Sequence, residues 1–131
     1  MKKCLLLLCC MFIVSCAKTK VSELTYNESG KDIFIYQNGS PFDGEAWCDD
    51  GKSYKLCVEC GVLNKVEYYT EKGSLLCVVS GETCEKVFYN SKGNEISREQ
   101  FRELYTKEYR QWKAHQRSMY KIVKEHPHSH F

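Results

Sequence analysis

This sequence has no apolar segment long enough to cross a membrane. Its main apolar run, Leu5 to Val14, has ten residues, whereas a membrane-spanning helix needs about 20. The sequence also has little net charge: the formal value of +2 comes from Lys2 and Lys3, and the rest of the chain has 17 basic and 17 acidic residues. A balanced chain lacks the basic field that attracts nucleic acid, so we expect no nucleic-acid partner.

Histidine is absent from the central part of the chain, residues 32–96. Without an imidazole there, the sequence argues against a Ser/His/Asp or Cys/His catalytic arrangement. The carboxylates of Asp43, Glu45 and Asp49 lie in or beside predicted turns, where charged residues are commonly solvated. We therefore predict a protein with no enzymatic activity, no catalytic residue and no cofactor.

The first 15 residues have the organisation of a secretory signal peptide, with two lysines before the apolar run. At the end of this segment, Ile13-Val14-Ser15-Cys16 resembles the lipobox of bacterial lipoprotein signal peptides. The resemblance implies cleavage before Cys16 and a lipid on its thiol. It places the mature chain in the bacterial cell envelope, on the periplasmic or outer-membrane face if the cell has two membranes. An uncleaved anchor and an ordinary signal peptide cut nearby are the alternatives.

Residues 16–31 are mostly polar after the first cysteine. Val21, Leu24 and Tyr26 are the only sizeable apolar side chains among them. A segment of this composition usually connects folded parts and does not itself pack. We predict a flexible tether between the lipidated Cys16 and the folded part of the chain.

Short runs rich in Tyr, Val, Phe and Ile alternate with Gly-containing turns from residue 32 onward, as is typical of β-hairpins. Asn38-Gly39 and Asp50-Gly51 are the strongest turn signals, because a type I′ turn requires positive φ. The other predicted turns are Cys60-Gly61, Lys72-Gly73, Ser80-Gly81 and Lys92-Gly93. The predicted strands span residues 32–37, 44–49, 53–59, 64–70, 74–80 and 84–90.

These hairpins form an internal repeat. Glu67-Tyr68-Tyr69-Thr70-Glu71-Lys72-Gly73 is echoed twenty residues later by Val87-Phe88-Tyr89-Asn90-Ser91-Lys92-Gly93, and residues 33–39 form a weaker copy. The segment Tyr36-Gln37-Asn38-Gly39-Ser40-Pro41-Phe42-Asp43-Gly44-Glu45 resembles the opening unit of the MORN-variant repeats of the YwqK-type family. The resemblance covers residues 32–96 and implies a single-layer antiparallel sheet. It also implies an antitoxin-like protein, although the cysteines around residues 57–60 and 84 depart from the family pattern.

Five cysteines follow Cys16. An oxidising compartment favours two disulfides and one leftover thiol. In a plain meander the turns place Cys57 near Val66. They place Cys77 near Phe88, so no cysteine faces another across adjacent strands. The alternative to disulfides is that some cysteines are small buried residues with free thiols. The candidates for a disulfide or a free thiol are Cys48, Cys57, Cys60, Cys77 and Cys84.

The Cys57-x-x-Cys60 pair has two further interpretations. A thioredoxin-like redox pair needs a βαβ setting, whereas this motif runs from a strand into a turn. A zinc site that also uses Cys77 and Cys84 has suitable ligands, but six residues separate the second pair instead of two to four. We therefore assign no metal ligand and keep metal or redox handling as an alternative.

Ser97-Arg98-Glu99-Gln100 fits a capping box, so we predict that one helix spans residues 97–125. At 100° per residue, apolar side chains share one arc of this helix and basic side chains the other. The apolar arc would cover one face of the sheet. The predicted fold is therefore mainly β with a C-terminal α region, a single-layer antiparallel meander of hairpins plus one long amphipathic helix.

The predicted helix is longer than the sheet is wide. Residues 98–125 would extend about 42 Å, whereas six strands make a sheet about 25–30 Å across. We expect the distal part to overhang and to bind another envelope protein, a second copy or the membrane interface. A chain cut after Gln111 would then keep a folded sheet and lose association. The candidate contact residues are Trp112, Met119, Ile122 and Val123.

All four histidines lie near the C-terminus. His115 lies at the edge of the apolar arc and is predicted to be packed. The pattern His126-Pro127-His128-Ser129-His130 has ligands suited to Zn²⁺, Ni²⁺ or Cu²⁺. We predict instead that residues 126–131 form a His-rich disordered tail.

Together these features favour a lipid-anchored envelope protein that acts as a non-catalytic protein-binding or scaffold module. The expected partners are the membrane, through the lipid on Cys16, and another envelope protein or a second copy, through the C-terminal helix. An antitoxin-like or immunity protein is the alternative, and it rests on the family resemblance alone.

Overall fold

The computed structural model describes residues 18–128. The predicted signal peptide, Cys16 and residues 129–131 lie outside the described residues. No helix within residues 18–128 is both long and apolar enough to span a bilayer. In chain order the elements are η1 (Val21–Glu23), β1 (Thr25–Ser29), β2 (Asp32–Gln37), β3 (Ser40–Pro41), β4 (Gly44–Trp47), β5 (Tyr54–Glu59), β6 (Val62–Tyr69), β7 (Leu75–Ser80), β8 (Lys86–Tyr89), β9 (Glu95–Ile96), α2 (Arg98–Leu104) and α3 (Thr106–Glu125).

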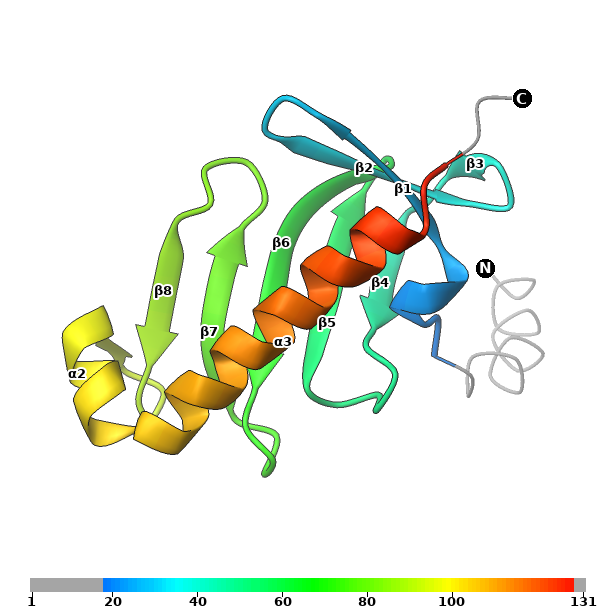
Figure 1. The fold of residues 1–131 in the computed structure, drawn as a ribbon. Coiled ribbons are helices and arrows are strands. Elements are labelled where there is room, and N and C mark those ends of the chain that lie inside the picture. Colours follow the sequence, from blue (N-terminus) through cyan, green and yellow to red (C-terminus); the bar gives the residue numbers. More distant parts are fainter. Residues whose placement is uncertain (1–17, 129–131) are drawn as a thin grey trace, which may run out of the picture.

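The strands form one open antiparallel sheet, and α3 lies diagonally across one of its faces (Figure 1). β5 to β9 follow one another as hairpins, joined by the Gly-containing turns that the sequence predicts. The alternation of apolar and polar residues explains why these strands have one buried face. The predicted fold class, mainly antiparallel β with a C-terminal helical region, is confirmed.

The sheet departs from a plain meander near its N-terminal strands. β2 pairs with β6, while β4 pairs with β5 on the other side of β6. At this junction the backbone N–H of Ile35 donates to the carbonyl of Gly61 at 2.7 Å, and that of Gly61 donates to the carbonyl of Phe42 at 2.8 Å. Gly61 has a φ of +82°, which favours glycine at this crossing.

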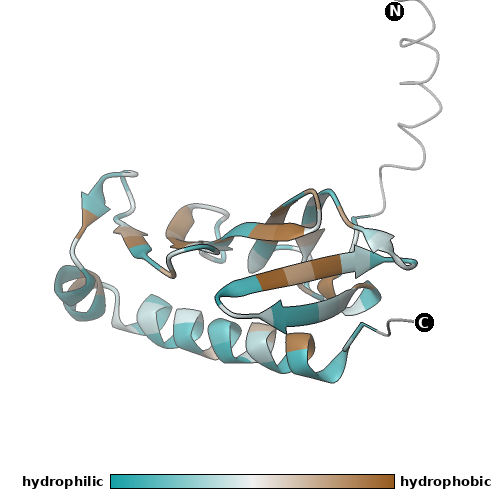
Figure 2. Cartoon of the chain, turned by 90° about the horizontal axis from the view of Figure 1, so that it is seen from above, coloured by the Kyte–Doolittle hydropathy of each residue, from teal (hydrophilic) through white to brown (hydrophobic). Residues whose placement is uncertain are grey.

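The hydrophobic core lies between the sheet and α3. Trp112 is 1% exposed, and its ring lies 5.1 Å from that of Phe88 and 6.3 Å from that of Tyr68. Figure 2 shows hydrophilic residues along the outer side of α3 and apolar segments in the strands. Buried sheet residues on the α3 side are Tyr54, Leu56, Val58, Val66, Tyr68, Cys77, Val79 and Phe88.

The predicted single helix over residues 97–125 is two helices. The capping box is present, because Gln100 N donates to Ser97 Oγ at 3.1 Å and Ser97 N donates to Gln100 Oε1 at 3.0 Å. The chain leaves helical geometry at Tyr105, which has φ −126° and ψ 55°. α2 packs on β8 through the stacked rings of Phe101 and Phe88, 4.7 Å apart. One straight helix could not make this contact and also cross the sheet diagonally, so the helix breaks.

The prediction of a flexible tether over residues 16–31 is wrong for the described part, residues 18–31. Val21, Leu24 and Tyr26 are all at most 2% exposed, and β1 pairs with β2 along its whole length. The three apolar side chains that the sequence shows in this segment therefore belong to the core.

The prediction of a disordered tail is wrong for residues 126–128. The backbone N–H of Tyr26 donates to the carbonyl of His126 at 2.9 Å, and the N–H of His128 donates to the carbonyl of Tyr26 at 2.9 Å. The tail therefore lies along β1, a long-range pairing that polar sequence composition does not reveal.

The predicted overhang of the distal helix is wrong. Met119 and Val123 are each 4% exposed, Trp112 is 1% exposed, and Ile122 packs against the core. β1, which is not among the predicted strands, widens the surface beneath α3, so the whole helix length of about 30 Å is supported. Trp112, Met119 and Val123 are core residues and Ile122 is partly buried against them, so cutting the chain after Gln111 would remove part of the core.

The burial of Trp112 gives a direct test of this packing. We expect Trp112→Ala to lower the free energy of unfolding by about 3–5 kcal/mol, because it leaves a cavity between the helix and the sheet. Arg117→Ala, on the exposed side of the same helix, should change it by less than about 0.5 kcal/mol. Urea unfolding followed by circular dichroism measures both values, and equal effects would contradict the packing.

Candidate functional site

The five cysteines of the described domain are free thiols in distinct surroundings. Cys48 and Cys77 are buried, Cys57 is half-buried, and Cys60 and Cys84 are exposed. Burial raises the pKa of Cys77 to about 12, and burial also raises the pKa of Cys48 and of Cys57. These three thiols therefore stay protonated at neutral pH and are poor nucleophiles.

The strand register keeps the cysteines apart. Cys77 pairs with Phe88, as predicted. Cys57 pairs with Lys65 and not with Val66, because the tight Cys60-Gly61 turn pairs Glu59 with Val62 and the register then shifts by only one residue after Cys57. No group of three or more His, Cys, Asp or Glu side chains suited to a metal ion occurs within residues 18–128. The four-cysteine zinc alternative is thus not assembled.

The first two histidines of the C-terminal motif make separate contacts. His126 Nδ1 lies 2.9 Å from the carbonyl of Ile122. The ring of His128 stacks on Tyr36 at 3.8 Å, and its Nδ1 lies 3.1 Å from Thr25 Oγ1. The third, His130, lies outside the described residues. His126 and His128 thus serve to fix the chain end on the edge of the sheet.

The face of the sheet opposite α3 has a network of paired charges. Lys55 Nζ lies 2.8 Å from Glu45 and 3.6 Å from Glu67. Glu67 also pairs with Lys65 at 3.0 Å and accepts from the hydroxyl of Tyr69 at 2.5 Å. Partial burial raises the pKa of Glu67, but these bonds outweigh it and lower the pKa overall. Because the charges satisfy one another across the strands, this face offers few free charges to a partner.

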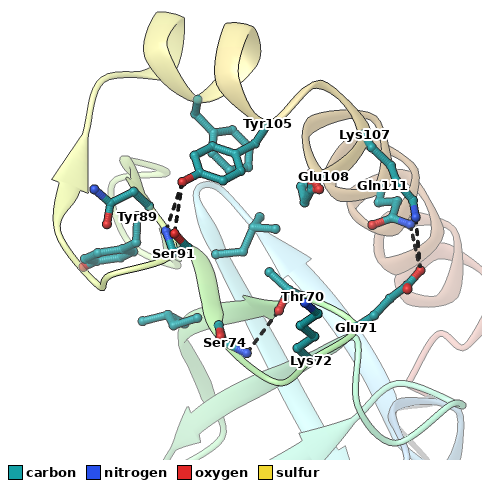
Figure 3. A pocket seen from close by; sticks show the side chains of 14 residues that line it. Thr70, Glu71, Lys72, Ser74, Tyr89, Ser91, Tyr105, Lys107, Glu108 and Gln111 are labelled. Atoms are coloured by element: carbon teal, nitrogen blue, oxygen red, sulfur yellow. Dashed lines mark hydrogen bonds and ion pairs between the residues drawn. The ribbon is translucent and has the colours of Figure 1, made fainter.

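A cavity of about 310 Å³ lies between the β6–β7 turn, the β8–β9 turn and the bend between α2 and α3. Figure 3 shows the hydroxyl of Tyr105 directed at Ser91, whose backbone N–H donates to it at 3.1 Å. On the other rim, Gln111 Nε2 lies 3.3 Å from Glu71, and Lys107 Nζ lies 3.9 Å from it. The polar groups of the rim therefore hold the turns to the helices.

The outer face of α3 differs from the charged face of the sheet and from the cavity rim because its charges are mostly unpaired. Within the described part of the chain, Lys107 is its only cation in an ion pair. Glu108 and Glu125 are the only acidic residues of this helix, and Tyr120 is 42% exposed. The exposed cations are Lys107, Arg110, Lys113, Arg117, Lys121 and Lys124.

The β4–β5 loop forms a rigid support beside the N-terminal segment. The carboxylate of Asp50 accepts from the backbone N–H groups of Lys52 and Ser53 at 2.8 Å, from the Ser53 hydroxyl and from the Cys48 thiol. Partial desolvation raises the pKa of Asp50, but these hydrogen bonds dominate and hold the pKa well below its usual range.

The first described residues are fixed to this loop. Lys18 Nζ donates to the carbonyl of Gly51 at 2.8 Å, and Lys20 Nζ donates to the carbonyl of Asp49 at 2.9 Å. Trp47 N donates to the carbonyl of Thr19 at 2.8 Å, and Lys18 Nζ lies 4.2 Å from the centre of the Trp47 ring. Only two peptide steps, at most about 7 Å, separate Lys18 from residue 16.

Comparisons with family models, with curated proteins and with solved structures found no match to this chain. The resemblances to the lipobox and to the MORN-variant repeats therefore stay predictions.

The pKa of Asp50 gives a pH test of the loop. Its carboxylate stabilises the fold above the ordinary aspartate pKa of about 3.9, and this contribution is lost as the pH falls below that value. We expect Asp50→Asn to lower the free energy of unfolding by about 1 kcal/mol at pH 7, since solvent screens this exposed group. The difference from the natural chain should shrink towards pH 3. A difference that is constant with pH, measured by urea unfolding, would contradict the assignment.

Proposed function

We propose that this chain is a bacterial envelope lipoprotein, anchored by lipid on Cys16, that binds another protein and catalyses no reaction. The outer face of α3 carries the proposal. Six cations lie exposed on one helix, and one of them has an ion pair within residues 18–128.

The partner surface that this helix fits is acidic. The apolar side of α3 is buried on the sheet, so its outer side can attract a partner mainly through charge. Arg110, Arg117 and Tyr120 are of the residue types enriched in protein interfaces. The rest of the described chain has an excess of acidic residues, so α3 is more basic than the remainder taken as a whole. We infer an envelope protein with an acidic docking surface as the partner.

The part of the proposal that excludes catalysis rests on the thiols and the histidines. Cys48, Cys57 and Cys77 have raised pKa values, and His126 and His128 are committed to contacts at the chain end. This arrangement supports a role in binding.

A charge-reversal variant tests the proposal. We expect the triple variant Arg110→Glu, Arg117→Glu, Lys121→Glu to lose at least about tenfold in partner capture from envelope extracts, because close charge contacts are each worth about 1 kcal/mol or more. Quantitative mass spectrometry of cross-linked complexes measures the loss, and sedimentation shows whether the partner is a second copy.

The matched control is the triple variant Lys31→Glu, Lys72→Glu, Lys92→Glu, which has the same charge change in turns outside α3. It should retain the partner. Equal losses in both variants would show that net charge and not the helix face determines capture, and undiminished capture by the helix variant would refute the proposed surface.

A further inference from the structure

Three lysine-bearing turns lie at one end of the sheet. Because β4 to β9 are antiparallel neighbours, the β4–β5, β6–β7 and β8–β9 connections all emerge at the same end (Figure 1). Each contains one exposed lysine beside a glycine: Lys52, Lys72 and Lys92. Within the described chain none of these three ammonium groups forms an ion pair. We call this the lysine-turn end.

The N-terminal segment arrives at the same end. The Lys18 and Lys20 side chains are bonded to the β4–β5 loop, and residue 16 is at most about 7 Å of chain from Lys18. A lipid on Cys16 would therefore bring this end, before any other part of the domain, to the membrane surface.

The two ends of the sheet differ in charge. The turns and N-terminal residues of the lysine-turn end contain five lysines and three acidic residues, whereas the turns at the opposite end contain one lysine and three acidic residues. An anionic surface would attract the first end and repel the second. The acidic residues of the opposite turns are Asp43, Glu82 and Glu85.

An exposed apolar side chain lies beside these turns. Leu104, at the end of α2, is 70% exposed, the most exposed of the large apolar residues described. It precedes Tyr105, whose hydroxyl is bonded to Ser91 of the β8–β9 turn. A leucine beside lysines is suited to the boundary between headgroups and acyl chains.

The basic face of α3 is separate from the lysine-turn end. Ala46 is buried on the core side of β4, so its neighbour Trp47 lies on the face opposite α3, where Lys18 covers its ring. The Lys18 side chain thus lies on the far side of the sheet from α3, and the outer face of α3 stays available to a protein partner.

We propose that the lysine-turn end lies on the anionic phospholipid headgroups of the membrane that holds the lipid of Cys16. The proposal rests on the anchor of the proposed function and adds the orientation of the domain. Each lysine near an anionic surface contributes about a fivefold preference for it, so three turn lysines suffice to orient a domain that is already tethered.

Lysine footprinting of the full lipidated chain tests this orientation. The protein is reconstituted in vesicles of phosphatidylethanolamine with phosphatidylglycerol and, separately, in phosphatidylcholine vesicles. A membrane-impermeant acetylating ester is added, and mass spectrometry measures the labelling rate of each lysine. We expect Lys52, Lys72 and Lys92 to react about threefold or more slowly in the anionic vesicles, and Lys31 and Lys113 to react at equal rates in both.

Two double variants isolate the turn lysines. Lys72→Gln with Lys92→Gln should restore fast labelling of Lys52 in anionic vesicles. The control variant, Lys31→Gln with Lys86→Gln, should leave Lys52 protected. If both behave alike, the turn lysines do not orient the domain and the inference fails.

The remaining outcomes separate this inference from the proposed function. An N-terminal peptide without lipid on Cys16 would overturn the anchor itself. In a lipidated sample, equal rates in both vesicles would overturn the orientation and leave the anchor intact. Slow labelling of Lys113 and Lys121 instead of the turn lysines would place α3 on the bilayer and would also overturn it.

Discussion

The packing of α3 across one face of the sheet is the interaction on which the rest of this structure depends. A single antiparallel sheet has no second layer to bury its apolar face, and α3 supplies that layer. Trp112 occupies the centre of the contact, between Phe88 and Tyr68. The same helix carries the chain back to β1, where His126 and His128 pair with Tyr26. Residues from both ends of the described chain thus belong to one core.

This packing leaves α3 with one free face, and that face is basic. Had the apolar arc overhung the sheet, association through buried apolar area would be the natural role of the helix. With Trp112, Met119 and Val123 inside the core, the proposed recognition uses the charged side. The charges on the opposite face of the sheet are paired with one another, which is why we propose the helix as the surface that attracts a partner.

Local sequence signals predicted the local part of the fold. The glycine-containing turns located the hairpins, β2 has the predicted bounds, and the capping box at Ser97 marked the start of α2. The signals failed where contacts are distant in sequence. Neither the pairing of β2 with β6 nor the pairing of Tyr26 with His126 leaves a periodic pattern, so the tether and the tail were both expected to be flexible.

The helical periodicity likewise predicted the two faces of the C-terminal helix but not the role of each face. The 100° pattern separates apolar from basic residues, yet it does not say how far the sheet extends beneath the helix. The break at Tyr105 depends on the contact of Phe101 with Phe88. A capping motif does not predict such a tertiary contact. For the same reason the apolar arc, and not the basic side, was expected to bind a partner.

The proposed function and the proposed orientation both require a lipid on Cys16, two residues before the first described residue. The mass of the mature protein, isolated from the membrane fraction of cells that produce the full chain, tests this most directly. We predict a chain that begins at Cys16 and carries acyl groups on that residue. A chain that begins elsewhere, or one that begins at an unmodified Cys16, would contradict the account.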